Sequence, residues 1–162
     1  MFKAVLFAFI IFGCGLVGQA VKNYYKQKVC YWSDALLLIV TLQAELDFYQ
    51  SKLPDVINKI SLQIGSAFLV DAKTLLKAVS GGCQQDVTIN NKLLTGDQNA
   101  NITRFFQMLG GTDIFSQKVQ LDYYKNIFDG YKANAEENYN KKGSMIFKLC
   151  VLAGLLLCVI LL

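Results

Sequence analysis

The fold of this chain is decided by its last stretch, Thr112 to Leu162, which reads TDIFSQKVQLDYYKNIFDGYKANAEENYNKKGSMIFKLCVLAGLLLCVILL. The stretch contains no proline, so nothing in it interrupts a helix. Its apolar side chains recur at steps of three and four residues, the spacing of one helix face: Leu121, Tyr124, Phe128, Tyr131 and Ala135. After two adjacent lysines the composition changes, and every residue from 149 to 162 is apolar or small. The pattern predicts one long helix with an apolar end.

The apolar end is long enough to cross a membrane when it is counted from Gly143. Residues 149–162 alone would rise about 21 Å as an α-helix, which is short of the roughly 30 Å hydrocarbon core of a bilayer. Counting from Gly143 gives about 30 Å, provided that Lys148 extends its ammonium to the headgroups. We therefore predict a C-terminal transmembrane helix at residues 143–162.

The N-terminal run from Ala4 to Val21 is uncharged, and it has three interpretations. It is a retained transmembrane helix, a cleaved or lipidated signal ending near Ala20 or at Cys14, or the strand of a dinucleotide site, since residues 13–18 fit GxGxxG. No alternation of strand and helix follows it, and only Lys3 and the terminal amine precede the run, whereas three lysines follow it. We interpret residues 1–22 as a transmembrane helix. Its glycines then allow a second helix to approach closely, and the predicted packing positions are Gly13, Gly15, Gly18 and Gly154.

Composition argues against several classes of function. The net charge of +4 over 162 residues is small and dispersed, unlike the basic patch of a nucleic-acid-binding protein. The chain has no histidine, the commonest general base and metal ligand. Its five cysteines contain no CxxC pair, and we interpret them as reduced thiols. We predict no metal, cofactor, small-molecule substrate or nucleic-acid partner, and no catalytic activity.

The residues between the two apolar runs predict an all-α domain, residues 23–142, built as a small antiparallel bundle. Apolar spacing predicts a helix over residues 31–50, a second from Pro54 through Val79 and a third over residues 102–109, with a polar loop or short helix over 83–101. The apolar face of the first of these helices is predicted at six positions: Trp32, Ala35, Ile39, Leu42, Leu46 and Tyr49. Lysines lie at the domain side of both apolar runs: Lys22, Lys26, Lys28, Lys141 and Lys142. The positive-inside rule therefore predicts that the domain is cytoplasmic.

Three short motifs occur in a fixed order along the chain. The first is LQAEL at 42–46, followed by Leu53-Pro54, and the last is LAGLLL at 152–157. Between them, the final predicted helix is introduced by Leu109-Gly110, Asp113, Ser116-Gln117 and Leu121. Together these motifs resemble the stage III sporulation protein AB family of endospore-forming bacteria. The resemblance runs from end to end and is weakest between about Gly65 and Asn101.

This resemblance implies a location and a set of partners. Such proteins are similar to half of the platform protein of type II secretion and type IV pilus machines. The implied location is the mother-cell membrane around the forespore. The implied partners are the lipid bilayer and the ATPase and membrane subunits of a channel complex that joins mother cell and forespore, and the implied role is assembly and coupling. The alternative function is that of an extracytoplasmic lipoprotein or secreted helical binding module.

The polar residues of the first two motifs have two interpretations. In one, Asp113 only caps a helix and Glu45 is a charge at the rim of the core. In the other, which the resemblance implies, they contact a neighbouring subunit. The predicted partner interface comprises Glu45, Leu109, Gly110, Asp113, Ser116 and Gln117.

Overall fold

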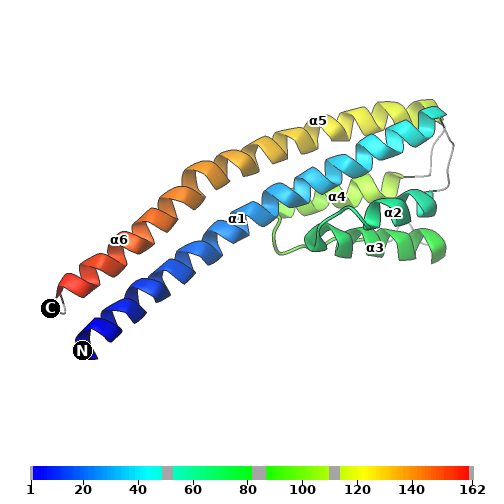
Figure 1. Ribbon diagram of the computed structural model, residues 1–162. Coiled ribbons are helices and arrows are strands. Elements are labelled where there is room, and N and C mark those ends of the chain that lie inside the picture. The colour runs from blue at the N-terminus through cyan, green and yellow to red at the C-terminus, as the bar shows by residue number, and fades with distance from the viewer. Residues whose placement is uncertain (1, 49–52, 82–86, 110–113, 161–162) are drawn as a thin grey trace. The chain divides into compact units, whose positions relative to one another are not determined.

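The computed structural model describes residues 2–48, 53–81, 87–109 and 114–160. Its elements are the helices α1 (Phe2–Phe48), α2 (Leu53–Ser61), α3 (Ser66–Gly81), α4 (Gly96–Met108), α5 (Ile114–Asn138) and α6 (Ser144–Ile160), with a π-helical turn, Tyr139–Gly143, joining the last two (Figure 1). The described ranges contain no strand, and two helical stretches, one of them near the N-terminus, are long and apolar enough to cross a membrane. The predicted all-α class is confirmed.

The chain forms two compact units, which divide it within α1 and α5. We call residues 1–29 with 133–162 the hairpin unit and residues 30–132 the bundle unit. The sequence predicted boundaries at residues 22 and 142, where the apolar runs end. The two units divide instead at residues 29/30 and 132/133, inside the predicted domain, so α1 and α5 each contribute residues to both units.

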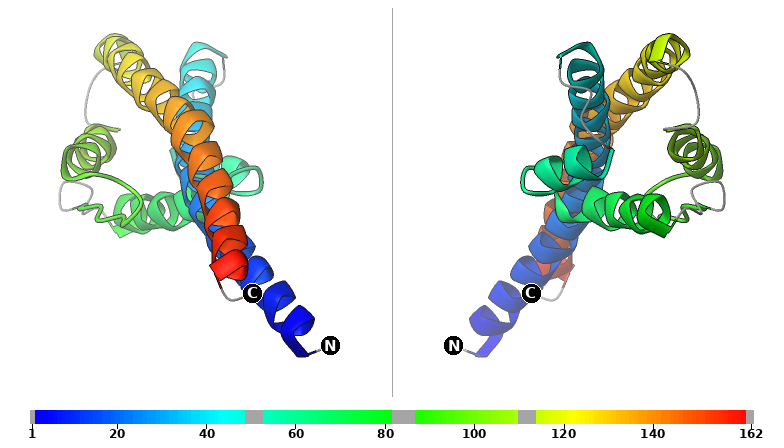
Figure 2. Two further views of the ribbon diagram at one scale, coloured as in Figure 1. Left: turned by 90° about the vertical axis from the view of Figure 1, so that its left-hand side faces the viewer. Right: turned by 90° about the vertical axis from the view of Figure 1, so that its right-hand side faces the viewer.

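The core of the bundle unit lies around an antiparallel pair of helices, the second part of α1 and the first part of α5. The rings of Trp32 and Phe128 lie 5.1 Å apart. Eleven residues further along α1, the Gln43 amide donates to the Asp122 carboxylate at 2.6 Å. Helices α2, α3 and α4 lie to one side of this pair (Figures 1 and 2).

The predicted apolar seams form the buried faces of both helices. Four of the six predicted α1 positions are buried, namely Trp32, Ala35, Ile39 and Leu42. On the long C-terminal helix, Leu121, Phe128 and Ala135 are buried, while Tyr124 and Tyr131 are half-buried. The predicted faces of these helices are confirmed, and Tyr49, the last α1 position, lies outside the described residues.

The predicted helix from Pro54 through Val79 is wrong in one respect, because it is two helices. Residues 62–65 form a turn, in which the backbone N–H of Gln63 donates to the Ile60 carbonyl at 2.7 Å. Leu62, in this turn, is 91% exposed. Helix α3 then begins beside Asp34 of α1, whose Oδ2 accepts from the Gly65 N–H at 2.9 Å. Burial raises the pKa of Asp34 above its ordinary value, and this hydrogen bond partly offsets the rise. The break follows from a cap supplied by a different helix.

Helix α4 begins earlier than the predicted Ile102. Thr95 and Gln98 form a capping box, in which Thr95 Oγ1 accepts from the Gln98 N–H at 3.4 Å and Gln98 Oε1 accepts from the Thr95 N–H at 3.1 Å. The preceding segment is not a strand, but its apolar side chains Val87, Ile89 and Leu94 are buried. The polar region is therefore an ordered part of the bundle unit from Val87 onward.

Candidate membrane hairpin and partner interface

Within the hairpin unit, the first part of α1 runs alongside α6, and Gly18 marks their close approach (Figures 1 and 2). A Cβ atom placed on Gly18 would lie 3.2 Å from the Cα of Phe147 and 3.3 Å from the Cβ of Cys150. Both distances are tighter than ordinary van der Waals contact. A side chain at this position would require Phe147 or Cys150 to shift by a few tenths of an ångström, so glycine permits the close approach of the two backbones.

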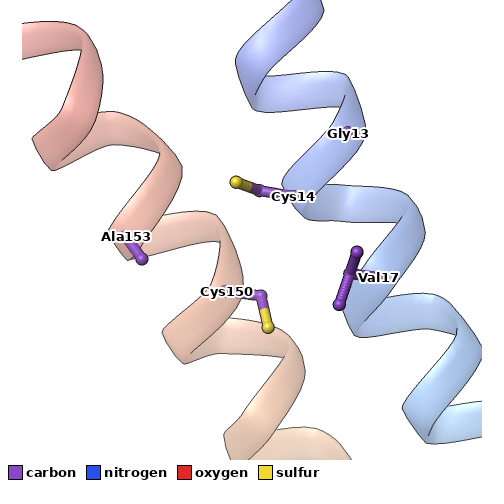
Figure 3. Close-up of a pocket in the computed structure, with 5 residues that line it drawn as sticks. All are labelled: Gly13, Cys14, Val17, Cys150 and Ala153. Carbon is purple, nitrogen blue, oxygen red and sulfur yellow. The ribbon is translucent and has the colours of Figure 1, made fainter.

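The other predicted packing glycines have different surroundings. A Cβ atom on Gly13 or Gly15 would meet nothing within 4 Å among the residues that the structure describes. Gly154 of α6 is buried. Beside Gly13 the helices leave an apolar groove of about 340 Å³, lined also by Cys14, Val17, Cys150 and Ala153 (Figure 3). Figure 3 shows the two cysteine side chains lying between the helices.

We expect Gly18→Leu to weaken the pairing of these helices, whereas Gly15→Leu leaves it unchanged. Overpacking costs about 1–3 kcal/mol, which corresponds to a roughly tenfold change in the packed population. The measurement is the yield of a short thiol cross-link between Cys14 and Cys150 in protein whose other three cysteines are replaced by serine. Equal yields from the two variants would show that the close approach at Gly18 does not hold the hairpin.

The two apolar runs of the hairpin unit end at the same level. A Cβ atom on Gly143 would lie 3.8 Å from the Lys22 side chain and 3.8 Å from the Tyr25 ring. The Lys22 ammonium lies 5.9 Å from the centroid of the Tyr139 ring, within reach of a cation–π interaction. Residues 4–21 and 143–160 are 18 residues each and rise about 27 Å as helices. Both therefore match one hydrocarbon core from a shared starting point.

Of the predicted interface residues, Glu45 faces the interior of the bundle unit. It is 8% exposed, and its Oε1 accepts from the Lys59 ammonium of α2 at 3.2 Å. The Lys59 side chain is 66% exposed, so the lysine is the solvent-facing member of this ion pair. The Glu45 carboxylate thus joins α1 to α2.

The remaining predicted interface residues lie around the junction of α4 and α5. Leu109 is buried immediately after α4, and Ser116 and Gln117 are half-buried in the first turn of α5. Gly110 and Asp113 lie outside the described residues. Because Gln43 bonds Asp122, the end of α1 that carries Glu45 lies at the same end of the helix pair as the start of α5.

The outer face of this α1–α5 pair carries apolar side chains that the sequence did not single out. Val40, Val119 and Tyr123 are 48%, 57% and 62% exposed. Val40 is one turn from Gln43, and Val119 is one turn from Asp122, so both lie on the face that the Gln43–Asp122 bond spans. We call Val40, Val119 and Tyr123 the outer strip. Three-residue spacing from a polar position was the available signal, but this signal is weak without knowledge of which helices pair.

A buried polar cluster was also missed. Asp71 of α3 is 7% exposed, and its Oδ2 accepts from the Tyr31 hydroxyl at 2.7 Å and from the Asn91 amide at 2.9 Å. Asn91 in turn exchanges two hydrogen bonds with Asn99, through its N–H at 2.9 Å and its carbonyl at 3.1 Å. The cluster holds the segment before α4 against α3, and nothing in the local sequence predicts partners so far apart.

Comparison with known protein families covers nearly the whole chain. The model of the family described as stage III sporulation protein AB matches residues 3–162. The chain belongs to the stage III sporulation protein AB family. Neither the curated proteins nor the solved structures provide a match.

Family membership gives the protein a role in sporulation and confirms the resemblance inferred from the three motifs. The match includes both apolar ends, so the hairpin unit is part of the family pattern and not an addition to it. In this stage III sporulation protein AB family member, two helices are long and apolar enough to cross a membrane, which favours membrane association.

Proposed function

We propose that this protein is a non-enzymatic, membrane-anchored platform subunit of the channel complex between mother cell and forespore. The hairpin unit anchors it in the mother-cell membrane around the forespore, and the bundle unit faces the cytoplasm. Family membership and the lysines at the domain side of both apolar runs support this arrangement. The partners are the ATPase and membrane subunits of the complex.

The observation that carries the platform role is the outer strip of the bundle unit. Three large apolar side chains exposed on the paired helices α1 and α5 cost free energy in water and gain it when a partner covers them. Val119 and Tyr123 of the strip lie on the same helix, α5, as Gln117, one of the predicted interface residues. Protein interfaces typically have such an apolar centre with a polar rim.

The outer strip is a better test of the interface than Glu45. Loss of the Glu45 carboxylate removes the pairing with Lys59 inside the bundle unit, so its effects on folding and on assembly would be mixed. Val119 and Tyr123 are more than half exposed, and surface substitutions of this kind usually change stability by less than about 0.5 kcal/mol.

We expect the double variant Val119→Glu/Tyr123→Glu to melt normally but to lose assembly and spore formation. Two carboxylates buried without partners at an interface would weaken binding by more than about 2 kcal/mol, or over tenfold. Co-purification with the ATPase and membrane subunits of the complex, together with spore yield, provides the measurement.

The matched control is Val70→Glu on α3, since Val70 is equally exposed at 64% but lies on a different helix. The control should assemble and sporulate like the unmodified protein. Normal assembly and normal spore yield in the double variant would overturn the platform interface, and so would equal losses in the double variant and the control.

A further inference from the structure

Five of the seven lysines of the hairpin unit lie near the level where both apolar runs end. Residues 22–28 contain three lysines and no acidic residue. Residues 133–142 contain two lysines and two glutamates. We define the interfacial collar as Lys22, Tyr24, Tyr25, Lys26 and Lys28 of α1 with Tyr139, Lys141 and Lys142 of the π-helical turn.

Contacts within the hairpin unit bring the two parts of the collar together. The Lys22 side chain lies against Gly143 and holds its ammonium over the Tyr139 ring. On α1 the Lys28 ammonium lies 5.1 Å from the centroid of the Tyr24 ring. Cation–π contacts of this kind keep the charge at the tyrosine ring while leaving the outer side of the ammonium open to an anion. Tyrosine rings themselves favour the headgroup level of a bilayer.

The acidic residues nearby neutralise only part of the collar. Lys141 and Glu137 form an ion pair at 2.7 Å, in which the hydrogen bond and the opposite charge raise the pKa of the lysine and lower that of the carboxyl. Glu136 is the other acidic residue within residues 133–142. Five lysines against two glutamates leave an excess of three positive charges, and Lys26 and Lys142 are exposed.

We propose that the interfacial collar selects phospholipids with anionic headgroups, binding their phosphates through Lys22, Lys26 and Lys142. This proposal rests on the proposed membrane insertion of the hairpin and adds the class of lipid that it binds. Each lysine close to an anionic bilayer surface strengthens binding by about fivefold. The excess charge lies at one level of two helices that both enter the bilayer there, so it acts on the headgroups adjacent to the protein.

A phosphate group reaches the collar either on a lipid or on a soluble metabolite. The two sources differ in where the anion is held. A lipid phosphate is kept at the membrane surface by its acyl chains, whereas a soluble phosphate must be bound by the lysines alone. Lys26 and Lys142 are exposed, so they face the surroundings of the helices, which favours the lipid.

The test uses the full-length protein reconstituted in phosphatidylcholine bilayers with a trace of spin-labelled phosphatidylglycerol or spin-labelled phosphatidylcholine. Electron paramagnetic resonance measures the share of each labelled lipid that is immobilised beside the protein. We expect a severalfold preference for phosphatidylglycerol that falls as salt rises from about 0.1 M to 1 M, because the screening length falls from about 10 Å to 3 Å. An equal share of the two lipids at low salt would overturn the proposal.

Charge variants assign the preference to the collar. Lys26→Gln/Lys142→Gln should lower the preference at least about twofold. The matched control, Lys73→Gln/Lys77→Gln, removes the same charge from exposed positions on α3 and should leave it unchanged. Equal decreases in both variants would show that total charge, and not the collar, selects the lipid.

Titration of the detergent-solubilised protein with glycerol phosphate separates the two sources of phosphate. Heat of binding that disappears in Lys26→Gln/Lys142→Gln would assign the collar to a soluble phosphate and overturn the lipid assignment. Absence of binding, together with the lipid preference, supports it. These lipid measurements need no partner subunit. The lipid preference can therefore be absent while assembly and spore formation are normal, and it can be present while assembly and spore formation fail.

Discussion

Asp71→Ala is expected to lower the free energy of unfolding of the bundle unit by about 3 kcal/mol or more. The substitution removes one carboxylate oxygen that accepts from both the Tyr31 hydroxyl and the Asn91 amide. Tyr31 is fully buried, so its hydroxyl cannot turn to water for another partner. Each buried donor left without a partner costs about 1–3 kcal/mol.

Tyr31→Phe separates the hydrogen bond from the rest of the cluster. It keeps the ring, which lies 5.2 Å from the Phe68 ring and 5.3 Å from the Trp32 ring, and it removes only the hydroxyl. We expect a loss of about 1.5–3 kcal/mol, the range for a hydrogen bond to a charged group. Tyr123→Phe is the matched control, because that hydroxyl belongs to a side chain that is 62% exposed, and its effect should be close to zero.

Fluorescence of Trp32 during denaturation of the full-length protein in detergent measures these losses. The chain has one tryptophan, and it is 1% exposed in the core of the bundle unit, so its emission reports the unfolding of that unit. If Tyr31→Phe is no more destabilising than Tyr123→Phe, the cluster does not stabilise the bundle unit.

The same cluster gives a dependence of stability on pH. Burial, followed by the charge and the hydrogen bond of Asp71, raises the pKa of Tyr31 well above its ordinary value of 10.0. In the unfolded chain the phenol ionises near 10.0, while in the folded protein it stays protonated. The contribution of Tyr31 to stability is therefore complete below pH 10 and decreases as the pH rises above it. Tyr31→Phe should remove this decrease.

The helices and their buried faces could be predicted because they depend on local spacing. Trp32, Ile39 and Phe128 occupy apolar positions of a helical period, and burial of one face follows from that period alone. The capping box of Thr95 and Gln98 was also available in the sequence, since a threonine followed three residues later by glutamine marks a helix start.

What could not be predicted depends on contacts between distant residues. The division of α2 from α3 needs Asp34, which is 31 residues from the amide that it accepts. The placement of Asn91 needs Asp71 and Asn99, and no local pattern relates these three residues. Similarly, Gly18 differs from Gly15 only because Phe147 and Cys150 lie opposite it. Periodicity identifies a face of a helix but not the residues that it meets.

The π-helical turn is the least predictable element, and it follows from packing along the hairpin unit. Ala135, Tyr139, Gly143 and Phe147 are separated by three steps of four residues, and Ala135 and Gly143 are buried. Four residues advance about 40° beyond a full turn of an α-helix, so three such steps would rotate the face by about 120°. A wider turn at Tyr139–Gly143 absorbs this rotation and keeps the face toward α1.

Phe128→Ala is expected to have the largest effect of any substitution proposed for this protein, about 3–5 kcal/mol. The side chain is fully buried, and its ring lies within 6.4 Å of four others, those of Trp32, Phe105, Tyr124 and Tyr131. Removing it leaves a cavity that α1, α4 and α5 all line, and three packed helices cannot collapse around it without losing other contacts.

The matched control for this substitution is Tyr123→Ala, a truncation of similar size on the same helix at an exposed position. It should change the free energy of unfolding by less than about 1 kcal/mol.

Comparing Phe128→Ala and Tyr123→Ala with the interface variants separates two causes of failed sporulation. Phe128→Ala should lower both the midpoint of Trp32 fluorescence and the spore yield, whereas Val119→Glu/Tyr123→Glu should lower the yield alone. A small change in unfolding free energy for Phe128→Ala would mean that the aromatic cluster does not form the core, because a cavity of this size in a close-packed interior cannot be neutral.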